Sequence, residues 1–327
     1  MKIGIAGAGF IVPSFLTAVK QVNDMNVMAI CGVDSDREKM EALSKEHCIP
    51  HLYYSYDEML ENRSIDTVYI AVPNFLHYHF TKKALQRGKN AFVEKPFASN
   101  YEHARELVDL SVEKHLYLFE AIANQYNPNY LKVKETVNEI GDIKLFQMNY
   151  SQYSRRYDSF KKGIILPVFD YKKSGGAIMD LNVYNIHFVV GIFGKPKSFH
   201  YYANIEKDID TSGILVMEYA TFLSLLVAAK DCKAPSSISI QGDRGYIYSD
   251  SPSNVFDRFE IKYNNGNEID YNLGCGQERL SFELRAFKEM ISNQEFDKMQ
   301  DKLGQSLLVQ QILDESRKQA GIEIMRN

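Results

Sequence analysis

Several features are missing from the sequence, and each absence narrows what the protein can be. Its 327 residues contain no block of lysines or arginines, no low-complexity stretch and no fixed-period repeat, and the net charge of −4 comes from both signs spread along the chain. We therefore expect neither nucleic acid nor an anionic membrane surface as a partner. No apolar run approaches the roughly 18 residues of a membrane-spanning helix, so we expect no membrane segment.

Cysteines are few and widely separated. The four of them form no CxxC pair. Structural zinc sites need close ligand pairs and disulfide frameworks need an oxidising compartment, so we predict neither. The chain begins with MKIGIAGAG, a strand followed by a glycine turn rather than a signal peptide, which favours a cytoplasmic location.

The composition is that of a soluble globular protein, and the length allows two domains. Hydrophobic residues make up 45% of the chain and charged residues 24%, which are ordinary proportions. In the first part of the chain, helical segments alternate with the short apolar runs KIGIA, VMAICGV, TVYIAV, NAFVE and LYLFEA. Such runs are typical of strands covered by helices on both faces. We predict an α/β fold, with a doubly wound parallel sheet over residues 1–121.

Two of the predicted helices begin with a capping box. Ser55 is followed by Glu58, and Ser99 by Glu102. In this motif the serine side chain accepts a hydrogen bond from a first-turn amide of the helix. We therefore expect helices to begin directly after Ser55 and after Ser99.

The first glycine turn, GAGFIV, predicts a dinucleotide site. Gly7 fits the tight turn of the Rossmann fingerprint, and Gly9 fits the close approach to a pyrophosphate; the third glycine is missing. Phe10 and Ile11 complete the turn and open a helix whose first amides can hold an anion. The alternative is a plain turn.

The end of the second strand bears on the choice of dinucleotide. Asp34 can accept hydrogen bonds from an adenosine ribose, which favours NAD, whereas Arg37 can hold the extra phosphate of NADP. Asp34 or Ser35 can also cap the following helix. The strand TVYIAV is followed by Pro73 and Asn74, at the edge where ligands of such sheets bind, although Asn74 can serve as a helix cap instead.

Two histidines follow that strand end, and one further strand ends in Glu94 and Lys95. His77 belongs to the candidate cofactor site, whereas His79 lies two residues on and points elsewhere on a helix, so the two cannot easily share a metal. Glu94 and Lys95 precede a proline in the segment FVEKPF, where a buried strand leaves the core.

The hydrophobic pattern of the sequence changes after residue 121. Longer segments that alternate apolar and polar residues predict a mostly antiparallel, open sheet, in an α+β domain over residues 122–327 whose last helix packs back on the first domain. Between these strands, Asp180, Tyr184 and His187 fall at helical spacings i, i+4 and i+7, so they share one face of a helix. Three polar groups on a face that is otherwise apolar suggest a lined pocket; the alternative is a buried tyrosine–histidine hydrogen bond without chemistry.

Taken together, these motifs resemble the Gfo/Idh/MocA oxidoreductases. The resemblance rests on GIAGAGFI, on AVPNFLHYHF followed by ALQRGKNAFVEKPFA, and on GGAIMDLNVYNIHFVVGIFGKP, and it covers most of the chain. EAIANQYNP and Tyr184 are most similar to the branch of dihydrodiol dehydrogenase and glucose–fructose oxidoreductase. The resemblance implies an N-terminal Rossmann domain and a C-terminal domain with a large open sheet.

The resemblance also implies roles for the site residues. Lys95 would lie beside the nicotinamide and polarise the substrate oxygen, Glu94 would steady this neighbourhood or the cofactor, and the bond between Lys95 and Pro96 would be cis. Tyr184 would be the acid–base, with its phenolate favoured by the lysine charge. Relatives similar to inositol dehydrogenase carry histidine at this position. Asp180 would orient substrate hydroxyls or the lysine, and His187 is the alternative proton carrier.

We therefore expect an oxidoreductase that uses NAD, or else NADP, and acts on a small polyhydroxylated molecule such as a sugar, cyclitol or diol. The second sheet is a candidate interface for a homodimer or homotetramer. Two other functions stay open at this point: an NAD-retaining glycoside hydrolase that works by transient oxidation, and a dinucleotide-binding regulator without enzymatic activity.

Overall fold

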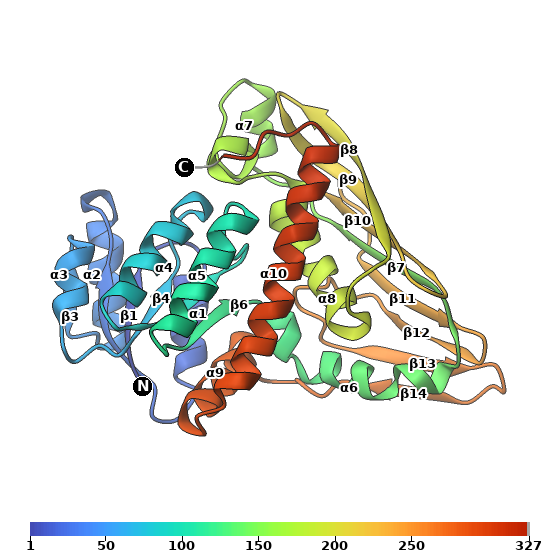
Figure 1. Cartoon of the computed structure of the whole chain (residues 1–327), viewed down its shortest axis with the longest axis horizontal. Coiled ribbons are helices and arrows are strands. Elements are labelled where there is room, and N and C mark those ends of the chain that lie inside the picture. Colours follow the sequence, from blue (N-terminus) through green and yellow to red (C-terminus); the bar gives the residue numbers. More distant parts are fainter. Residues whose placement is uncertain (326–327) are drawn as a thin grey trace. The chain divides into compact units, whose positions relative to one another are not determined.

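A computed structural model describes residues 1–325 of the chain, which divides into two compact units (Figure 1). The first unit contains Met1–Ala121 and Gln277–Leu307, and the second contains Ile122–Gly276 and the chain from Leu308 onward. The sequence placed all residues after 121 in one domain, whereas 277–307 cluster with the first unit. Helix α10 (Phe296–Gln319) is continuous through the last boundary.

The first unit is built on a parallel sheet of six strands in the order β3-β2-β1-β4-β5-β6. The strands are β1 (Lys2–Ala6), β2 (Asn26–Cys31), β3 (His51–Tyr53), β4 (Thr67–Ile70), β5 (Asn90–Glu94) and β6 (Leu118–Ala121). This strand order is that of the doubly wound dinucleotide-binding fold. All four residues of β4 are buried, as expected for a strand covered on both faces. The predicted fold class of this unit is confirmed.

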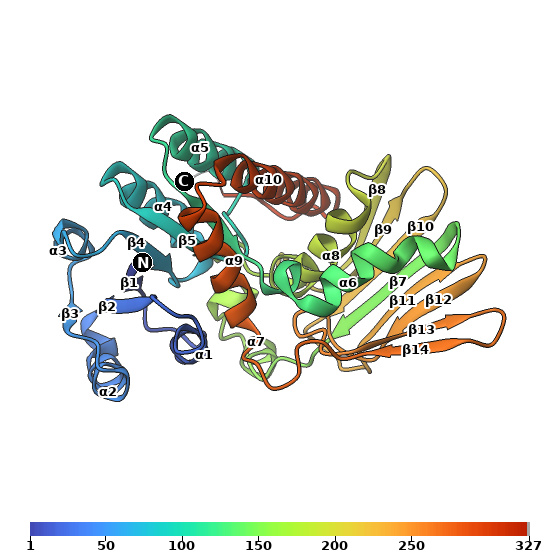
Figure 2. The same ribbon diagram turned by 90° about the horizontal axis from the view of Figure 1, so that it is seen from below.

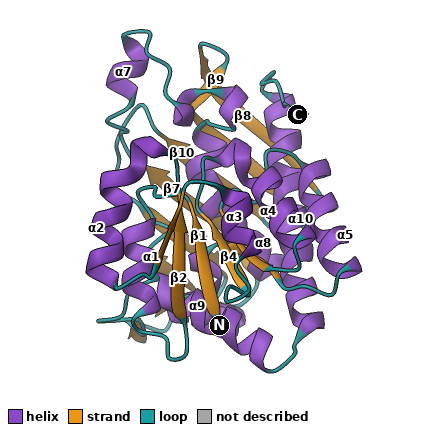
Figure 3. Cartoon of the chain, turned by 90° about the vertical axis from the view of Figure 1, so that its left-hand side faces the viewer, coloured by secondary structure: helices purple, strands orange, loops and turns teal. Residues whose placement is uncertain are grey.

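Helices cover both faces of this sheet. They are α1 (Val12–Val19), α2 (Arg37–His47), α3 (Tyr56–Glu61), α4 (His77–Gln86), α5 (Tyr101–Glu113) and α9 (Leu280–Ser292). Figure 3 shows the strands of this unit between α1 and α2 on one side and α4 and α5 on the other. The arrangement leaves the carboxyl ends of β1, β4 and β5 side by side along one edge of the sheet.

One of the two predicted capping boxes is correct and the other is displaced. The Ser55 side chain accepts a hydrogen bond from the Glu58 amide at the start of α3. At α5 the cap is Asn100, whose side chain accepts from the His103 amide at 2.8 Å. The prediction of Ser99 as the cap is wrong because the helix begins one residue later, so the extended residue before it is Asn100.

The second unit is built on an eight-stranded sheet in the order β14-β13-β12-β11-β7-β10-β9-β8. The strands are β7 (Ile143–Ser151), β8 (Ser198–Glu206), β9 (Ile209–Glu218), β10 (Leu223–Ala229), β11 (Ser237–Gly242), β12 (Gly245–Ser249), β13 (Phe259–Tyr263) and β14 (Glu268–Tyr271). β7 and β10 pair in parallel, whereas the other neighbouring pairs are antiparallel. The predicted mostly antiparallel open sheet is confirmed.

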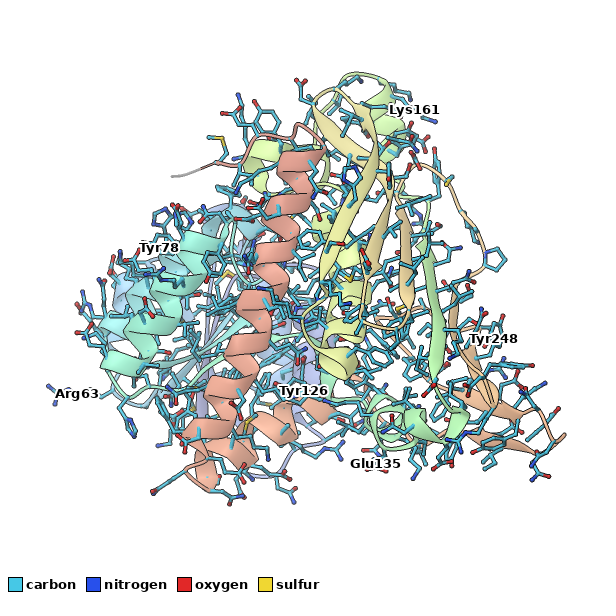
Figure 4. The ribbon with its side chains drawn as sticks, turned by 45° about the vertical axis from the view of Figure 1, so that its right-hand side comes forward. Arg63, Tyr78, Tyr126, Glu135, Lys161 and Tyr248 are labelled. Carbon is cyan, nitrogen blue, oxygen red and sulfur yellow. The ribbon has the colours of Figure 1, made fainter. Side chains whose placement is uncertain are left out.

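Helices α6 (Pro128–Thr136) and α8 (Val183–Phe193) lie on one face of this sheet (Figures 1 and 2). Inward residues of the strands, among them Phe146 and Leu226, form a core with Phe188 of α8. The opposite face keeps apolar side chains exposed. They include Leu145, Tyr202, Ile214, Leu223 and Tyr248, the last of which is labelled in Figure 4.

One apolar stretch bears on the expectation that no segment could cross a membrane. Tyr171–Phe193, which includes α8, is long and apolar enough by length and composition alone. However, 78% of its most apolar window is buried within the protein. A buried core helix of a soluble protein passes the same test, so this stretch gives little support to a membrane span.

Candidate active site

The glycine turn after β1 is shaped by two different constraints. Gly7 has a φ of +106°, and a Cβ there would lie 2.4 Å from the carbonyl oxygen of Ala71, so the packing of the chain itself requires glycine. A Cβ at Gly9 would meet only the same oxygen at 3.5 Å, which is an ordinary contact. The protein's own packing therefore leaves room beside Gly9, and this room is what a closely approaching pyrophosphate needs.

The helix that follows the turn is suited to an anion. α1 begins after Ile11 without a side-chain cap, and it has no acidic residue in its first turn. The Val12 amide donates to the Gly9 carbonyl at 3.3 Å and Pro13 has no amide, so Ser14 is the first residue of the helix whose amide can serve a phosphate. Phe10 is 92% exposed at the tip of the turn. These features fit a bound dinucleotide.

Asp34 and Arg37 form one unit at the end of β2. The Arg37 guanidinium lies 2.9 Å from Asp34 Oδ1 and stacks on the Tyr54 ring, 4.3 Å from its centroid. Both charged side chains are more than half exposed. Asp34 lies in a short 3-10 turn before α2, and no side chain accepts a capping hydrogen bond at the start of this turn or of α2. The carboxylate suited to a ribose and the guanidinium suited to a phosphate therefore stand in direct contact.

His77 connects the ends of two neighbouring strands. Its buried ring places Nδ1 2.8 Å from the carbonyl oxygen of Pro96 and Nε2 3.0 Å from that of Val72. Burial lowers the pKa of His77, although the two carbonyl acceptors oppose this shift. The ring is thus engaged with the backbone after β4 and after β5. Pro73 and Asn74, the other candidates at this edge, form the short turn just before it.

The loop after β5 carries Lys95 and is held from a second side. The bond between Lys95 and Pro96 is cis, as the resemblance implies. Glu120 of β6 accepts a hydrogen bond from the Phe97 amide at 3.1 Å through Oε1. His77 and Glu120 therefore hold the residues on the carboxyl side of Lys95. Glu120 is the first residue of the segment EAIANQYNP that carries the resemblance, but its contact with the loop of Lys95 was not predicted.

Glu94, the residue before Lys95, is half-buried and belongs to a polar cluster together with two buried side chains. Tyr69 donates a hydrogen bond to Glu94 Oε1 at 2.5 Å, and burial raises the pKa of both groups. Glu283 of α9 is 2% exposed, and burial together with the Glu94 charge raises the pKa of its carboxyl well above the usual value. Arg279 opposes these carboxyl shifts. Glu94 is thus fixed within the protein, and nothing in the sequence linked it to Glu283.

In the second unit, Asp180 lies on an irregular helix start. Ile178–Asn182 form a π-helical turn that leads directly into α8; such turns are frequent at functional sites. Asp180 forms an ion pair with Lys230, which directly follows β10. Sequence reasoning missed Lys230 because the two residues are distant in the chain.

Tyr184 and His187 are buried on α8. Tyr184 is 8% exposed and its ring lies edge-on to that of Tyr150, with centroids 6.3 Å apart; His187 is 1% exposed. Side-chain amides hold the helix backbone at both positions. Asn124 donates to the carbonyl of Tyr184 at 2.9 Å and Gln125 to that of His187 at 2.6 Å. The helix that carries the proposed proton carrier is therefore fixed in its own unit.

A buried carboxylate fixes the start of this helix. Asp210 accepts hydrogen bonds from the Ile178 amide and the Tyr201 hydroxyl, each at 2.7 Å, and burial raises its pKa to about 6. Gly176 has a φ of +107°, and a Cβ there would lie 2.1 Å from Asp210 Oδ1. The glycine is therefore required by the close approach of Asp210. Within residues 1–325, no group of three or more histidine, cysteine, aspartate or glutamate side chains could hold a metal ion.

The fold and the glycine turn define a dinucleotide-dependent oxidoreductase with a Rossmann domain. The model of an oxidoreductase family with an NAD-binding Rossmann fold matches residues 1–122, and the model of the GFO/IDH/MocA C-terminal domain matches residues 130–248. The chain belongs to the Gfo/Idh/MocA family, and the predicted membership is confirmed.

Two relatives named for an enzymatic activity match over nearly the whole chain. The scyllo-inositol 2-dehydrogenase (NADP(+)) IolU of Bacillus subtilis (strain 168) is 29% identical over 324 residues, which cover 98% of each chain. The trans-1,2-dihydrobenzene-1,2-diol dehydrogenase of Xenopus tropicalis is 25% identical over 339 residues, again 98% of each. The predicted similarity to the dihydrodiol dehydrogenase branch is confirmed.

Solved structures share the fold. KijD10, a 3-ketoreductase from Actinomadura kijaniata in complex with NADP and TDP-benzene, has a TM-score of 0.85 at 19% identity and covers 97% of both chains. Levoglucosan dehydrogenase in complex with NADH and levoglucosan has a TM-score of 0.84 at 16% identity and covers 98% of this chain and 97% of the other.

Proposed function

We propose that this protein is an NAD(P)-dependent dehydrogenase or reductase that acts on a CH–OH group of a sugar, cyclitol or diol. The observation that carries the proposal is the constrained position of Lys95. Its loop leaves β5 at the same sheet edge as the glycine turn of β1, and His77 and Glu120 hold the following residues. A surface lysine at a strand end needs no such support, whereas a catalytic ammonium needs a fixed position.

Each candidate residue has a role in this proposal. A bound nicotinamide supplies hydride transfer to or from carbon. Lys95 donates a hydrogen bond to the substrate oxygen and stabilises the charge that develops on it. Tyr184 exchanges the proton of that oxygen; a phenol with an ordinary pKa near 10 is a weak base, and a nearby cation favours its phenolate. His187 is the second candidate for the proton transfer.

The cofactor proposal is NAD with NADP as a second cofactor. Asp34 is suited to hydrogen-bond the ribose of NAD. The exposed Arg37 side chain can exchange its ion pair with Asp34 for one with the ribose phosphate of NADP. The relative IolU is named for NADP(+). Replacing Arg37 with alanine should therefore weaken NADP binding more than NAD binding, and Asp34→Ala should do the reverse.

The test is a single series of measurements on the purified protein. Binding of NAD, NADH, NADP and NADPH is measured first, and nicotinamide absorbance is then followed while sugars, cyclitols and diols are added one by one. Turnover with members of this panel supports the proposal. Dinucleotide binding without any net absorbance change would favour the internal-redox hydrolase or the regulator instead, and no binding would overturn the cofactor site.

We further propose a cytoplasmic homodimer or homotetramer that associates through the exposed face of the eight-stranded sheet. Exposed apolar side chains on neighbouring strands support this proposal, because Leu145 pairs with Leu223 and Tyr202 with Ile214 on that face. Light scattering after size exclusion tests it: the wild type should be oligomeric and Leu223→Asp should shift the protein towards the monomer.

A further inference from the structure

The ammonium group of Lys230 is buried, but few groups around it can accept its hydrogen bonds. The residue is 3% exposed. Among residues 1–325, its side chain contacts one carboxylate oxygen of Asp180 and the face of the Phe169 ring, 5.6 Å from the centroid. An ammonium carries three N–H donors, so donor capacity is left over in a place that water reaches poorly. Burying charge without full hydrogen bonding is costly, and a ligand oxygen would relieve this cost.

The ion pair opens on one side only. The Lys230 side chain is 4% exposed, whereas that of Asp180 is 28% exposed. Phe169 closes the side of the lysine with an aromatic ring that is itself buried. A ligand therefore reaches the pair past Asp180, and it meets an acceptor and a donor together.

We infer that Lys230 and Asp180 form a clamp for a substrate hydroxyl, a role that rests on the proposed function and specifies its substrate class. A hydroxyl can accept a hydrogen bond from the Lys230 ammonium and donate its own proton to the Asp180 carboxylate. A carbonyl or carboxylate could satisfy only the lysine, and Asp180 would repel a carboxylate. The pair is thus selective for a hydroxyl.

The clamped hydroxyl differs from the reacting one. Asp180 precedes Tyr184 by four residues on the same helical segment, and side chains at this spacing are neighbours, with roughly 5–6 Å between their Cβ atoms. Tyr184 is the proposed proton carrier for the reacting carbinol. A hydroxyl held by Lys230 and Asp180 therefore belongs to a nearby carbon of the same molecule, so the preferred substrate is a diol or polyol rather than a simple alcohol.

The experiment compares Lys230→Met with Lys230→Arg and a matched control, Lys233→Met. Lys233 is exposed and lies three residues further on. Binding of myo-inositol and of D-glucose to the protein saturated with dinucleotide is measured by calorimetry, next to binding of their monodeoxy analogues. Thermal unfolding of each variant shows whether it is folded.

The clamp predicts a specific pattern of affinities. Lys230→Met should weaken binding of the polyol that the wild type binds better by about 10- to 100-fold, the usual effect of losing a hydrogen bond to a charged group. Lys230→Arg should recover part of this loss and Lys233→Met should have no effect. One monodeoxy analogue, which lacks the clamped hydroxyl, should bind wild type and Lys230→Met equally.

Two results would overturn the clamp: equal losses for every monodeoxy analogue, or unchanged polyol affinity in a folded Lys230→Met variant. Failure of both polyols to bind the wild type would overturn it as well. Turnover is recorded separately on the same samples. Polyol binding that depends on Lys230 without any net redox would support the clamp and contradict the proposed dehydrogenase function. Polyol turnover that Lys230→Met leaves unchanged would support the dehydrogenase function and contradict the clamp.

Discussion

The two site lysines are positioned in different ways. Lys95 lies on a loop whose backbone is held by buried side chains, because His77 contacts the carbonyl of Pro96 and Glu120 accepts from the amide of Phe97. Lys230 is held by its own charge, through the ion pair with Asp180. Backbone contacts fix where a side chain starts, whereas an ion pair fixes where its charged end lies. The first arrangement suits a residue that must meet a changing substrate oxygen, and the second suits a residue that binds one fixed group.

The largest expected effect concerns the chemical step. Lys95→Met and Tyr184→Phe should each reduce kcat by about 10²- to 10⁴-fold, the usual contribution of a positioned proton donor or acceptor. Dinucleotide affinity should stay nearly unchanged, since neither change alters the glycine turn. Steady-state kinetics and dinucleotide titration measure the two effects.

His187→Gln serves as the comparison for this pair. If His187→Gln lowers kcat by this factor while Tyr184→Phe retains full turnover, the proton carrier is His187. Full activity of Lys95→Met would remove the loop after β5 from the mechanism.

The glycine turn separates a folding requirement from a binding requirement. Gly7→Ala should destabilise the protein, because the added Cβ would lie 2.4 Å from the Ala71 carbonyl and φ is +106°. Gly9→Ala should leave the unfolding free energy within about 1 kcal/mol, as expected for a Gly→Ala change without a steric conflict. It should nevertheless weaken dinucleotide binding. Urea titration and dinucleotide titration of both variants test this, and normal cofactor affinity in Gly9→Ala would contradict the close approach of the pyrophosphate to Gly9.

Releasing the loop of Lys95 should have a smaller effect than removing the lysine. His77→Phe keeps a ring of similar size but removes both contacts with the carbonyls of Val72 and Pro96. We expect kcat to fall by up to about 10²-fold, since small displacements of a catalytic group have effects of this size. The exposed His79→Phe is the control. Equal kinetics in both variants would show that His77 does not position Lys95.

A pH dependence of the unfolding free energy is expected from Asp210. Its folded pKa of about 6 lies above the ordinary 3.8, so the unfolded chain loses this proton first as pH rises. The contribution to stability is therefore present below the ordinary pKa and is lost as pH rises through the folded value. The loss is roughly 3 kcal/mol, because one pKa unit corresponds to about 1.4 kcal/mol.

Urea denaturation of Asp210→Asn between pH 4 and 7 measures this dependence. The variant should lose less stability over this range than the wild type does. Asp208→Asn, a change at an exposed position two residues away, should follow the wild type. A curve of Asp210→Asn that is parallel to the wild type would contradict the raised pKa.

Local and long-range features differ in how well the sequence predicts them. The apolar runs predicted five of the six strands in the first unit, because a strand buried on both faces is apolar along its length. The short strand β3 (His51–Tyr53) was not among these runs, and its residues are exposed or half-buried. The candidate residues Lys95, Asp180 and Tyr184 followed from motifs. The residues that contact them or the loop of Lys95, and the neighbour of Glu94, could not be predicted: Glu120, Lys230 and Glu283 each depend on contacts between distant segments. The displaced cap at Asn100 and the π-helical turn at Asp180 depend on single-residue shifts that propensity does not determine.

The protonation of His77 also limits how many of its two neighbouring backbone carbonyls can accept a hydrogen bond from the ring at one time. A neutral imidazole carries one N–H and can donate to one carbonyl, whereas an imidazolium carries two. Burial favours the neutral ring, so the choice of tautomer becomes a choice between the backbone after β4 and the loop of Lys95. The arrival of a single proton would connect both at once. Nitrogen chemical shifts of a protein labelled at His77 report the tautomer and protonation of the ring directly. They would show whether the loop of Lys95, the backbone after β4, or both accept a hydrogen bond from His77.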